Sequence, residues 1–265
     1  MEELREMSLF ADGVRIAEDS RMRIRGRATM SLRPDLWELN IFSPPSDALA
    51  AIHDAKQLMV EGEEMSTIAC GQIEEIYTHQ EGDKNITTVI LSDGMDFWSS
   101  TVSVALAKGN TVYETIRTLV AKCTAPAPIV SLQASDAYFF RGQTFHGKTV
   151  NYISDLAKSI QARAFFVRGG LHFAVKGAGT EKIVLRESDL MNDISEANGA
   201  YVVQLAGMKG YPIGQIVEFP ELTASRFRLL CQSIEADNYE GPWKSELIMV
   251  DESKVKSGDD WGGGL

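Results

Sequence analysis

The feature that most constrains the fold is a series of short alternating segments, separated by turn signals, over residues 21–92. Apolar and polar residues alternate over 21–32 and again over 36–42, with Arg33-Pro34-Asp35 between them. Alternation with a period of two is typical of half-buried β-strands, and the intervening turn signal predicts a hairpin. A short helix and further strands are expected at 46–52, 57–60, 66–77 and 85–91. This spacing predicts a small antiparallel barrel or sandwich, and not a parallel sheet with crossover helices.

The pattern becomes helical at two places within residues 99–176. Thr111-Val112-Tyr113-Glu114 resembles a capping box, and the stretch Gly-x-Thr-Val at 109–112 recurs at 147–150, again where an amphipathic segment begins. Apolar residues at helical spacing are Val112, Ile116, Leu119, Val120 and Cys123 in the first segment and Val150, Ile153, Leu156, Ala157 and Ile160 in the second. A hairpin around Arg168-Gly169-Gly170 follows. We therefore expect a small α/β insert with two amphipathic helices.

The tripeptide Gly-Gln-Ile occurs twice, at 71–73 and at 214–216. Each copy lies in a segment expected to be a strand, and each is followed by a turn and a long return strand, over 85–91 and 227–235. We interpret the pair as a barrel duplicated within one chain. This interpretation predicts that Gly71 and Gly214 occupy equivalent positions.

The expected fold class is α+β and mainly β, with two similar small antiparallel β-barrels separated by the α/β insert. The first 20 residues fit a short helix that runs into a strand, with a turn at Ala11-Asp12-Gly13. The expected parts are a first tube-like barrel at 1–98, the insert at 99–176, a second tube-like barrel at 177–255 and a flexible Gly-rich tail at 256–265.

Charge and cysteine content restrict the classes of protein. The formal net charge is −11 and the sequence pI is about 4.9, which disfavours nucleic-acid binding through phosphates. Cys70, Cys123 and Cys231 lie far apart in apolar surroundings, which indicates buried, reduced thiols. No segment approaches the roughly 20 continuous apolar residues of a membrane span. The stretch MEELREMSLF carries acids where a signal peptide needs bases, so we expect folding in a cytoplasm.

Motifs that would carry chemistry are absent from the sequence. There is no GxxxxGK[ST] phosphate loop, no GxSxG nucleophile and no HExxH, and the four histidines are isolated. Glu74 and Glu75 are adjacent on an expected strand and would point to opposite faces. Trp37, Trp98 and Trp243 fit core packing, whereas Trp261 is expected to be exposed in the tail. We predict no catalytic, cofactor-binding or metal-binding residue and no cofactor, although paired carboxylates from distant segments stay open.

The order of these parts resembles the hub proteins of long-tailed bacteriophages and of related contractile injection machines. The resemblance covers residues 20–255. It begins with the hairpin-rich first barrel, which contains the Gly-Gln-Ile strand and the strand ending at Asp93, and it continues through the two Gly-x-Thr-Val units to the second barrel. That barrel contains YPIGQIVEF and closes with RFRLLCQSIEADNYEGPWKSELIMV. The final stretch, Trp243 to Val250, is the most family-like, and Ser245 stands where the family more often has Thr.

The resemblance implies a structural virion protein without catalysis, located in the tail baseplate or tail tip and assembled in the host cytoplasm. It implies a homotrimeric hub ring whose six barrels adapt the sixfold tail tube above to a threefold central spike or tail-tip protein below. Genomic DNA would pass through the ring without specific binding, and no membrane insertion is implied. Two alternatives are a β-rich hydrolase with distant paired carboxylates and a peptidoglycan-binding module, to which the Gly-x-Thr-Val units have a loose likeness.

Overall fold

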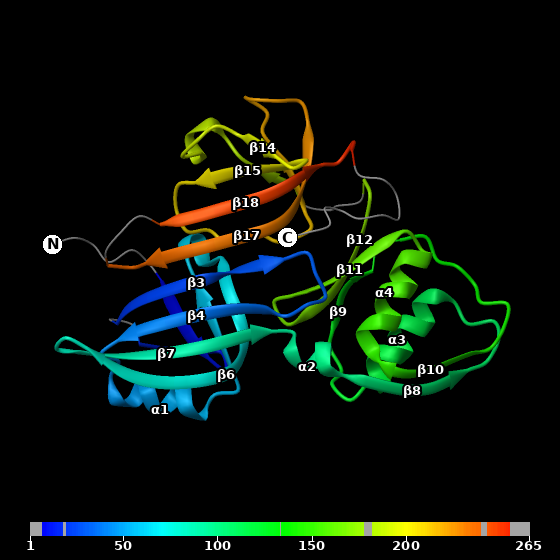
Figure 1. Ribbon diagram of the computed structural model, residues 1–265, viewed down its shortest axis with the longest axis horizontal. Coiled ribbons are helices and arrows are strands. Elements are labelled where there is room, and N and C mark those ends of the chain that lie inside the picture. Colours follow the sequence, from blue (N-terminus) through cyan, green and yellow to red (C-terminus); the bar gives the residue numbers. More distant parts are fainter. Residues whose placement is uncertain (1–6, 18–19, 133, 178–181, 240–242, 255–265) are drawn as a thin grey trace.

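The computed structural model describes residues 7–17, 20–132, 134–177, 182–239 and 243–254 (Figure 1). The described part of the chain is mainly β, with 50% of its residues in strands, and it contains four α-helices. Trp261 and the expected tail lie outside the described residues. No described helix has the length and apolarity needed to cross a membrane.

The first β-rich region, residues 7–93, consists of antiparallel strands with one short helix. The hairpin expected over 21–42 is confirmed, because β3 and β4 pair from Arg21 with Phe42 to Gly26 with Trp37. Residues 8–16 form a hairpin around the expected turn at Asp12-Gly13, so the helix considered for the first residues is not found in the described part. The elements are β1 (Ser8–Ala11), β2 (Val14–Ile16), β3 (Arg21–Thr29), β4 (Asp35–Phe42), α1 (Ser46–Asp54), β5 (Gln57–Glu61), β6 (Thr67–Glu81) and β7 (Lys84–Asp93).

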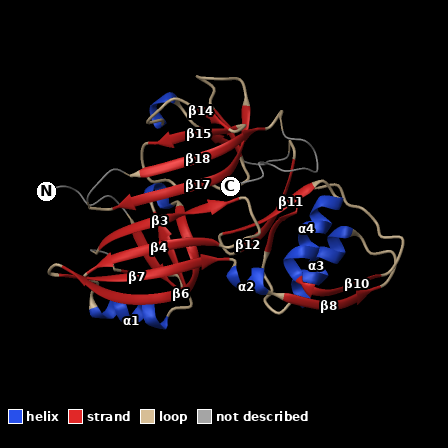
Figure 2. Ribbon diagram, in the orientation of Figure 1, coloured by secondary structure: helices blue, strands red, loops and turns tan. Residues whose placement is uncertain are grey.

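The insert, residues 94–177, contains both expected amphipathic helices, gathered at one end of the molecule (Figure 2). The ten apolar positions named from the sequence are all buried, which confirms the helical faces. The capping box is also confirmed: Thr111 Oγ1 accepts from the Glu114 N–H, and Glu114 Oε2 accepts from the Thr111 N–H. The elements are α2 (Met95–Ser99), β8 (Thr101–Leu106), α3 (Val112–Lys122), β9 (Ile129–Leu132), β10 (Gln143–Lys148), α4 (Thr149–Ser159), β11 (Ala162–Val167) and β12 (Gly170–Val175).

The second β-rich region, residues 182–254, returns to mainly antiparallel strands. Its longest pair, β17 with β18, corresponds to the expected strands over 227–235 and 243–250. One feature departs from the antiparallel expectation, because β13 pairs with β16 in parallel. The elements are β13 (Lys182–Val184), β14 (Ser195–Ala197), β15 (Ala200–Leu205), β16 (Ile216–Glu218), β17 (Arg226–Asp237) and β18 (Lys244–Asp251).

The two β-rich regions share a single 13-stranded sheet. The order β14-β15-β18-β17-β3-β4-β7-β6-β5-β1-β2 is open at both ends within the described residues, so two separate closed barrels are not found there. The physical reason is the length of β17. Its first residues pair with β16, and its later residues, from Cys231 to Asp237, pair with β3.

The hydrophobic cores also cross between the regions. Trp243 and Met208 come from the second β-rich region, yet both are buried in the core cluster of the first, beside Trp37 and Leu39. The second region has its own cluster around Phe219 and Phe227, and the insert has a third. Burial of apolar surface therefore stabilises the two β-rich regions jointly, in addition to the backbone pairing.

The two Gly-Gln-Ile copies differ in local structure. Gly71 lies within β6, where a Cβ atom would come within 2.6 Å of the Ser92 carbonyl oxygen. Gly214 lies in a turn before β16, with φ +83°. The prediction that the two glycines are equivalent is wrong at the level of backbone conformation, although each copy precedes a hairpin.

Candidate functional site

The pairing of β3 with β17 is the structural centre of the molecule, and we call it the seam. It runs antiparallel from Thr29 opposite Cys231 to Arg23 opposite Asp237. On β3 the residues Met22 and Ile24 are buried, whereas Arg23 and Arg25 are exposed, so one face of the sheet packs on the core and the other meets solvent.

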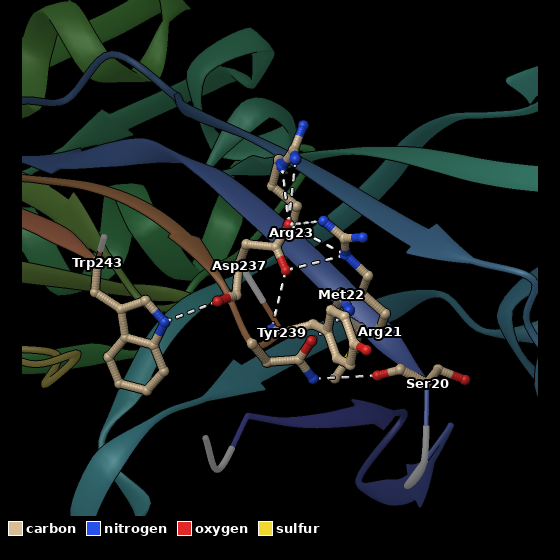
Figure 3. Close-up of polar contacts among 8 residues, drawn as sticks. Ser20, Arg21, Met22, Arg23, Asp237, Tyr239 and Trp243 are labelled. Atoms are coloured by element: carbon tan, nitrogen blue, oxygen red, sulfur yellow. Dashed lines mark hydrogen bonds and ion pairs between the residues drawn. The ribbon is translucent and has the colours of Figure 1, made fainter. Parts of the chain in front are cut away.

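One end of the seam is held by a polar cluster around Asp237 (Figure 3). Arg21 Nη2 donates to Asp237 Oδ2 at 2.8 Å, and Arg23 Nη2 donates to the same oxygen at 3.2 Å. The Tyr239 N–H donates to Asp237 Oδ1 at 3.0 Å. The Arg21 guanidinium also lies 4.5 Å from the ring centroid of Phe42, within the range of a cation–π interaction. Asp237 is buried, so these donors compensate for its lost hydration.

The main chain beside this cluster is fixed by buried polar groups. Asn238 Oδ1 accepts from the Met22 N–H at 2.8 Å, and Asn238 Nδ2 donates to the Ser20 carbonyl at 3.1 Å. Trp243 Nε1 donates to the Asp237 carbonyl at 2.8 Å, while its ring is buried in the first core (Figure 3). The start of β3 and the end of β17 are therefore held in one register.

The exposed face of the sheet carries charges of alternating sign across the seam. Residues paired directly opposite each other share a face, and one such row crosses six strands. From β6 to β18 the row reads Glu75, Ile90, Glu38, Arg25, Glu235 and Lys244. Charged residues of both signs lie on this face, among them six basic residues, Arg21, Arg23, Arg25, Arg27, Lys84 and Lys244, and six acidic residues, Glu38, Glu75, Glu81, Glu235, Asp237 and Glu246. The formal charge of the face is balanced, although the chain as a whole is acidic.

A second junction joins the insert to both β-rich regions. Asp93, the last residue of β7, accepts hydrogen bonds from the main-chain N–H groups of Arg168 and Gly169 in the β11–β12 turn. Arg168 Nη2 reaches the Thr67 carbonyl at 2.7 Å and the Tyr211 carbonyl at 3.3 Å. Both turn residues have positive φ, as the two-residue hairpin around Arg168-Gly169 predicted.

Asp93 pairs with Asp35 across β4 and β7, which brings two carboxylates from distant segments together. Burial raises the pKa of Asp35 to about 7 and that of Asp93 to about 6, and each carboxylate already accepts two hydrogen bonds, those of Asp35 from Thr29. A shallow cleft of about 360 Å³ lies beside Asp93, between Cys70, Asp96 and Phe166. Asp35 is only 4% exposed and does not line this cleft, whereas Asp93 and Asp96 both do. The Asp93 carboxylate already accepts two main-chain hydrogen bonds and that of Asp96 one from the Gln72 side chain, so both acids of the cleft have structural partners.

The other candidate residues named from the sequence lie in packed or strand-paired environments. Trp37 and Trp243 are buried as expected, and Trp98 is partly buried against the insert core. The three cysteines are free, and burial raises the pKa of Cys70 to about 11 and that of Cys231 to about 12, which makes these thiols weakly reactive. Glu74 is the unpaired residue of a β-bulge between Ile73 and Glu75, which interrupts the alternation expected there.

The histidines, cysteines and acids are the side chains that could form a metal site. In the part of the chain that the structure describes, no three His, Cys, Asp or Glu side chains are placed to hold a metal ion. His172 stacks on Phe165 at 5.2 Å, and burial lowers the pKa of its imidazole. The features with the most organised chemistry are thus the seam and its charged face, which sequence periodicity did not reveal.

The fold defined by these regions is that of phage tail proteins. No family model and no curated protein sequence matches the chain. Among solved structures it is similar to the tail protein from Neisseria meningitidis MC58, at 12% identity over 92% of this chain and 95% of that chain, with a TM-score of 0.63. The 43 kDa tail protein of prophage MuSo2 from Shewanella oneidensis is similar at 10% identity over 93% and 98%, with a TM-score of 0.66.

A third similar structure comes from the type VI secretion system. The E. coli c3393 protein, described as structurally similar to the T4 bacteriophage tail proteins gp27 and gp5, matches at 11% identity over 92% of this chain and 76% of that chain, with a TM-score of 0.64. At these identities the comparisons establish the fold. That fold agrees with the resemblance to tail hub proteins indicated by the order of segments in the sequence.

Proposed function

We propose that this protein is a structural component of a phage tail or a related injection machine, in which three copies form a hub ring. The observation that carries the proposal is the continuous sheet through both β-rich regions, in a fold shared over nearly the full length of two tail proteins. Each copy contributes two β-rich units, so a trimer presents six such units with threefold symmetry. Such a ring adapts a sixfold tail tube above to a threefold spike or tail-tip protein below.

The three hydrophobic cores divide the chain into three parts with different proposed roles. In this proposal residues 1–98 and 177–255 are the two tube-like units, and residues 99–176 are a peripheral insert. Each β-rich unit occupies the position of one barrel in the ring, although neither closes into a separate barrel. The crossing of Trp243 into the first core supports a rigid relationship between the two units. Rigidity suits a ring whose six positions must match a tube.

The exposed face across the seam is the surface that we assign to the wall of the DNA conduit. Its strands run through both units, so three copies would supply one uninterrupted lining. Its charged side chains are balanced, and arginines such as Arg25 lie between acids on both neighbouring strands. Paired arginines have less net attraction for phosphates than an isolated basic patch, which suits DNA that must pass without specific binding.

The test is the oligomeric state in solution together with the image of the assembly. Light scattering should give the mass of three chains, and electron microscopy should show rings with threefold symmetry and a central opening. A monomer at all protein concentrations, alone or mixed with the adjoining tail-tube protein, contradicts the hub ring. Pull-down with purified peptidoglycan separates the glycan-binding alternative, which predicts retention by the glycan without ring formation.

A further inference from the structure

Charge is strongly segregated along the chain. Residues 99–176 contain nine basic and three acidic residues, a net charge of +6, which leaves −17 for the rest of a chain whose total is −11. The insert is therefore a basic body on an acidic protein. A basic surface and an acidic surface on the same molecule are complementary between two copies.

The insert also displays aromatic side chains to solvent. In the segment from residue 134 to 142, Tyr138 is 68% exposed and Phe140 is 92% exposed, whereas Phe139 between them packs against the insert core. Exposed aromatic rings are costly in water, and clustered exposure marks interaction sites.

This segment is held in place by the beginning of α3. The N–H of Val112 donates to the Ala137 carbonyl at 2.8 Å, and the N–H of Tyr113 donates to Asp136 Oδ1 at 3.1 Å. Phe139 exchanges two main-chain hydrogen bonds with the chain before the helix, at Gly109 and Asn110. The segment thus satisfies N–H groups at the start of the helix, and its two exposed rings project from a fixed backbone.

Two exposed basic residues accompany the rings. Lys108 comes two residues after the end of β8 and Arg141 two residues before the start of β10, at the end of the pair where Leu106 lies opposite Gln143. Neither has an acidic partner among the described residues. We call Lys108, Tyr138, Phe140 and Arg141 the insert tip.

The opposite end of the molecule has the complementary character. The hairpin that joins β6 to β7 lies at one end of the longest axis, and the insert helices lie at the other (Figure 1). Its turn carries exposed Glu81 and Asp83 beside exposed Lys84, which pairs with Glu81, and Glu74 and Glu75 are exposed further along β6. These four acids outnumber the one basic residue of the turn. Beyond Gln72, β6 pairs only with β7 among the described strands, so its other edge is open.

We propose that the insert tip of one copy binds the acidic β6–β7 hairpin of a second copy. This inference rests on the proposed hub ring and names the contact that closes it. The two aromatic rings supply apolar anchors, and Lys108 and Arg141 face the acids of the neighbouring hairpin. A contact between opposite ends of identical chains is heterologous. Such contacts close into a ring of three copies when each copy is rotated by about a third of a turn relative to the next.

The experiment is a charge swap read out by sedimentation velocity of the full chain. The wild-type protein should associate, and the association should weaken in high salt. Phe140→Ser and the double variant Lys108→Glu/Arg141→Glu should each weaken it, the charge reversal by about 100-fold in Kd. Adding Glu81→Lys/Asp83→Lys to that reversal should restore most of the lost affinity. Lys122→Glu/Lys158→Glu makes the same charge change on exposed helix residues of the insert and should leave association unchanged.

Different outcomes overturn different statements. A wild-type protein that stays monomeric both alone and mixed with the adjoining tail-tube protein contradicts the hub ring itself. A trimer whose Kd is unchanged in Phe140→Ser and in Lys108→Glu/Arg141→Glu leaves the ring standing and overturns the contact proposed for the insert tip. Loss on charge reversal without restoration by Glu81→Lys/Asp83→Lys contradicts the assignment of the hairpin. Binding of the wild-type tip to anionic lipid vesicles, with self-association unaffected by the variants, also overturns the proposal. Circular dichroism confirms that each variant is folded.

Discussion

The carboxylate of Asp93 accepts a 2.8 Å hydrogen bond from the main-chain N–H of Gly169. This bond joins the end of β7 in the first β-rich region to the tip of the β11–β12 hairpin in the insert. Arg168, the other residue of that turn, donates to Asp93 through its main chain and to the Tyr211 carbonyl of the second region through its side chain. A two-residue turn therefore holds all three parts of the chain together.

Asp93→Ala is expected to destabilise the protein by about 2–4 kcal/mol, because two partly buried N–H groups lose their acceptor. Urea unfolding at neutral pH measures the change in the free energy of unfolding. Asp96→Ala is the matched control. Asp96 is exposed and accepts only a side-chain hydrogen bond from Gln72, at 2.9 Å, so its removal should matter little. Equal effects of the two substitutions would contradict the role assigned to Asp93.

Asp35→Asn is expected to stabilise the protein at alkaline pH and to have little effect in acid. Burial, and to a smaller extent the nearby Asp93 charge, raises the pKa of Asp35 to about 7 from its ordinary value of 3.8. The folded state thus holds this proton more tightly than the unfolded state, and the resulting stability is lost as pH rises from about 4 to about 7. Asn keeps an oxygen for the Thr29 N–H and a donor for the Thr29 hydroxyl, without the charge.

The expected gain for Asp35→Asn is on the order of 4 kcal/mol at about pH 8, since the folded-state pKa of about 7 lies about 3 above the ordinary value of 3.8 and each pKa unit corresponds to about 1.4 kcal/mol. Thermal melts of both proteins across this pH range provide the measurement. If the difference in stability between wild type and variant is the same in acid and in alkali, Asp35 does not titrate as described.

Arg21→Ala and Arg23→Ala should differ in cost, although both side chains bind Asp237. The side chain of Arg21 is 15% exposed and that of Arg23 is 49% exposed. Loss of the buried partner should cost about 2–4 kcal/mol, whereas loss of the exposed one should cost less than about 1 kcal/mol. Chemical unfolding of both variants checks the order, and a larger effect at Arg23 would show that the seam is held differently.

The local elements were largely predictable from the sequence because their signals are local. The capping box at Thr111 and Glu114, the two-residue turn at Arg168-Gly169 and the strand alternation over 21–42 each depend on neighbours only a few residues apart. The seam was not predictable in the same way. Arg23 and Asp237 are 214 residues apart in sequence, and alternation says which face a residue occupies but not which strand lies beside it.

The alternating charges across the sheet were hidden for the same reason. Arg25, Glu38 and Glu235 look like ordinary solvated charges in the sequence, and only the register of three strands places them in one row. The charge segregation of the insert was visible in composition by segment, but the total of −11 concealed it. The exposure of Phe140 depends on the packing of its neighbour Phe139, which a sequence pattern does not specify.

The repeated Gly-Gln-Ile supplies a final prediction, since its two glycines are required for different reasons. At Gly71 a Cβ atom would lie 2.6 Å from the Ser92 carbonyl oxygen, and the backbone of β7 cannot move without breaking its pairing. At Gly214 a Cβ atom would lie 2.7 Å from the Phe165 ring, and φ is +83°. Gly82 is the control, because it has φ +64° and open space around it.

Gly82→Ala should therefore cost about 1 kcal/mol from backbone strain alone, and Gly71→Ala and Gly214→Ala about 3 kcal/mol or more. Adding Phe165→Leu, which shortens the opposing side chain, should recover part of the loss at Gly214 and none at Gly71. Unfolding free energies of the single and double variants measure this difference. Recovery at both glycines, or at neither, would contradict the two separate steric causes, and with them the conclusion that the repeated tripeptide has two different structural roles.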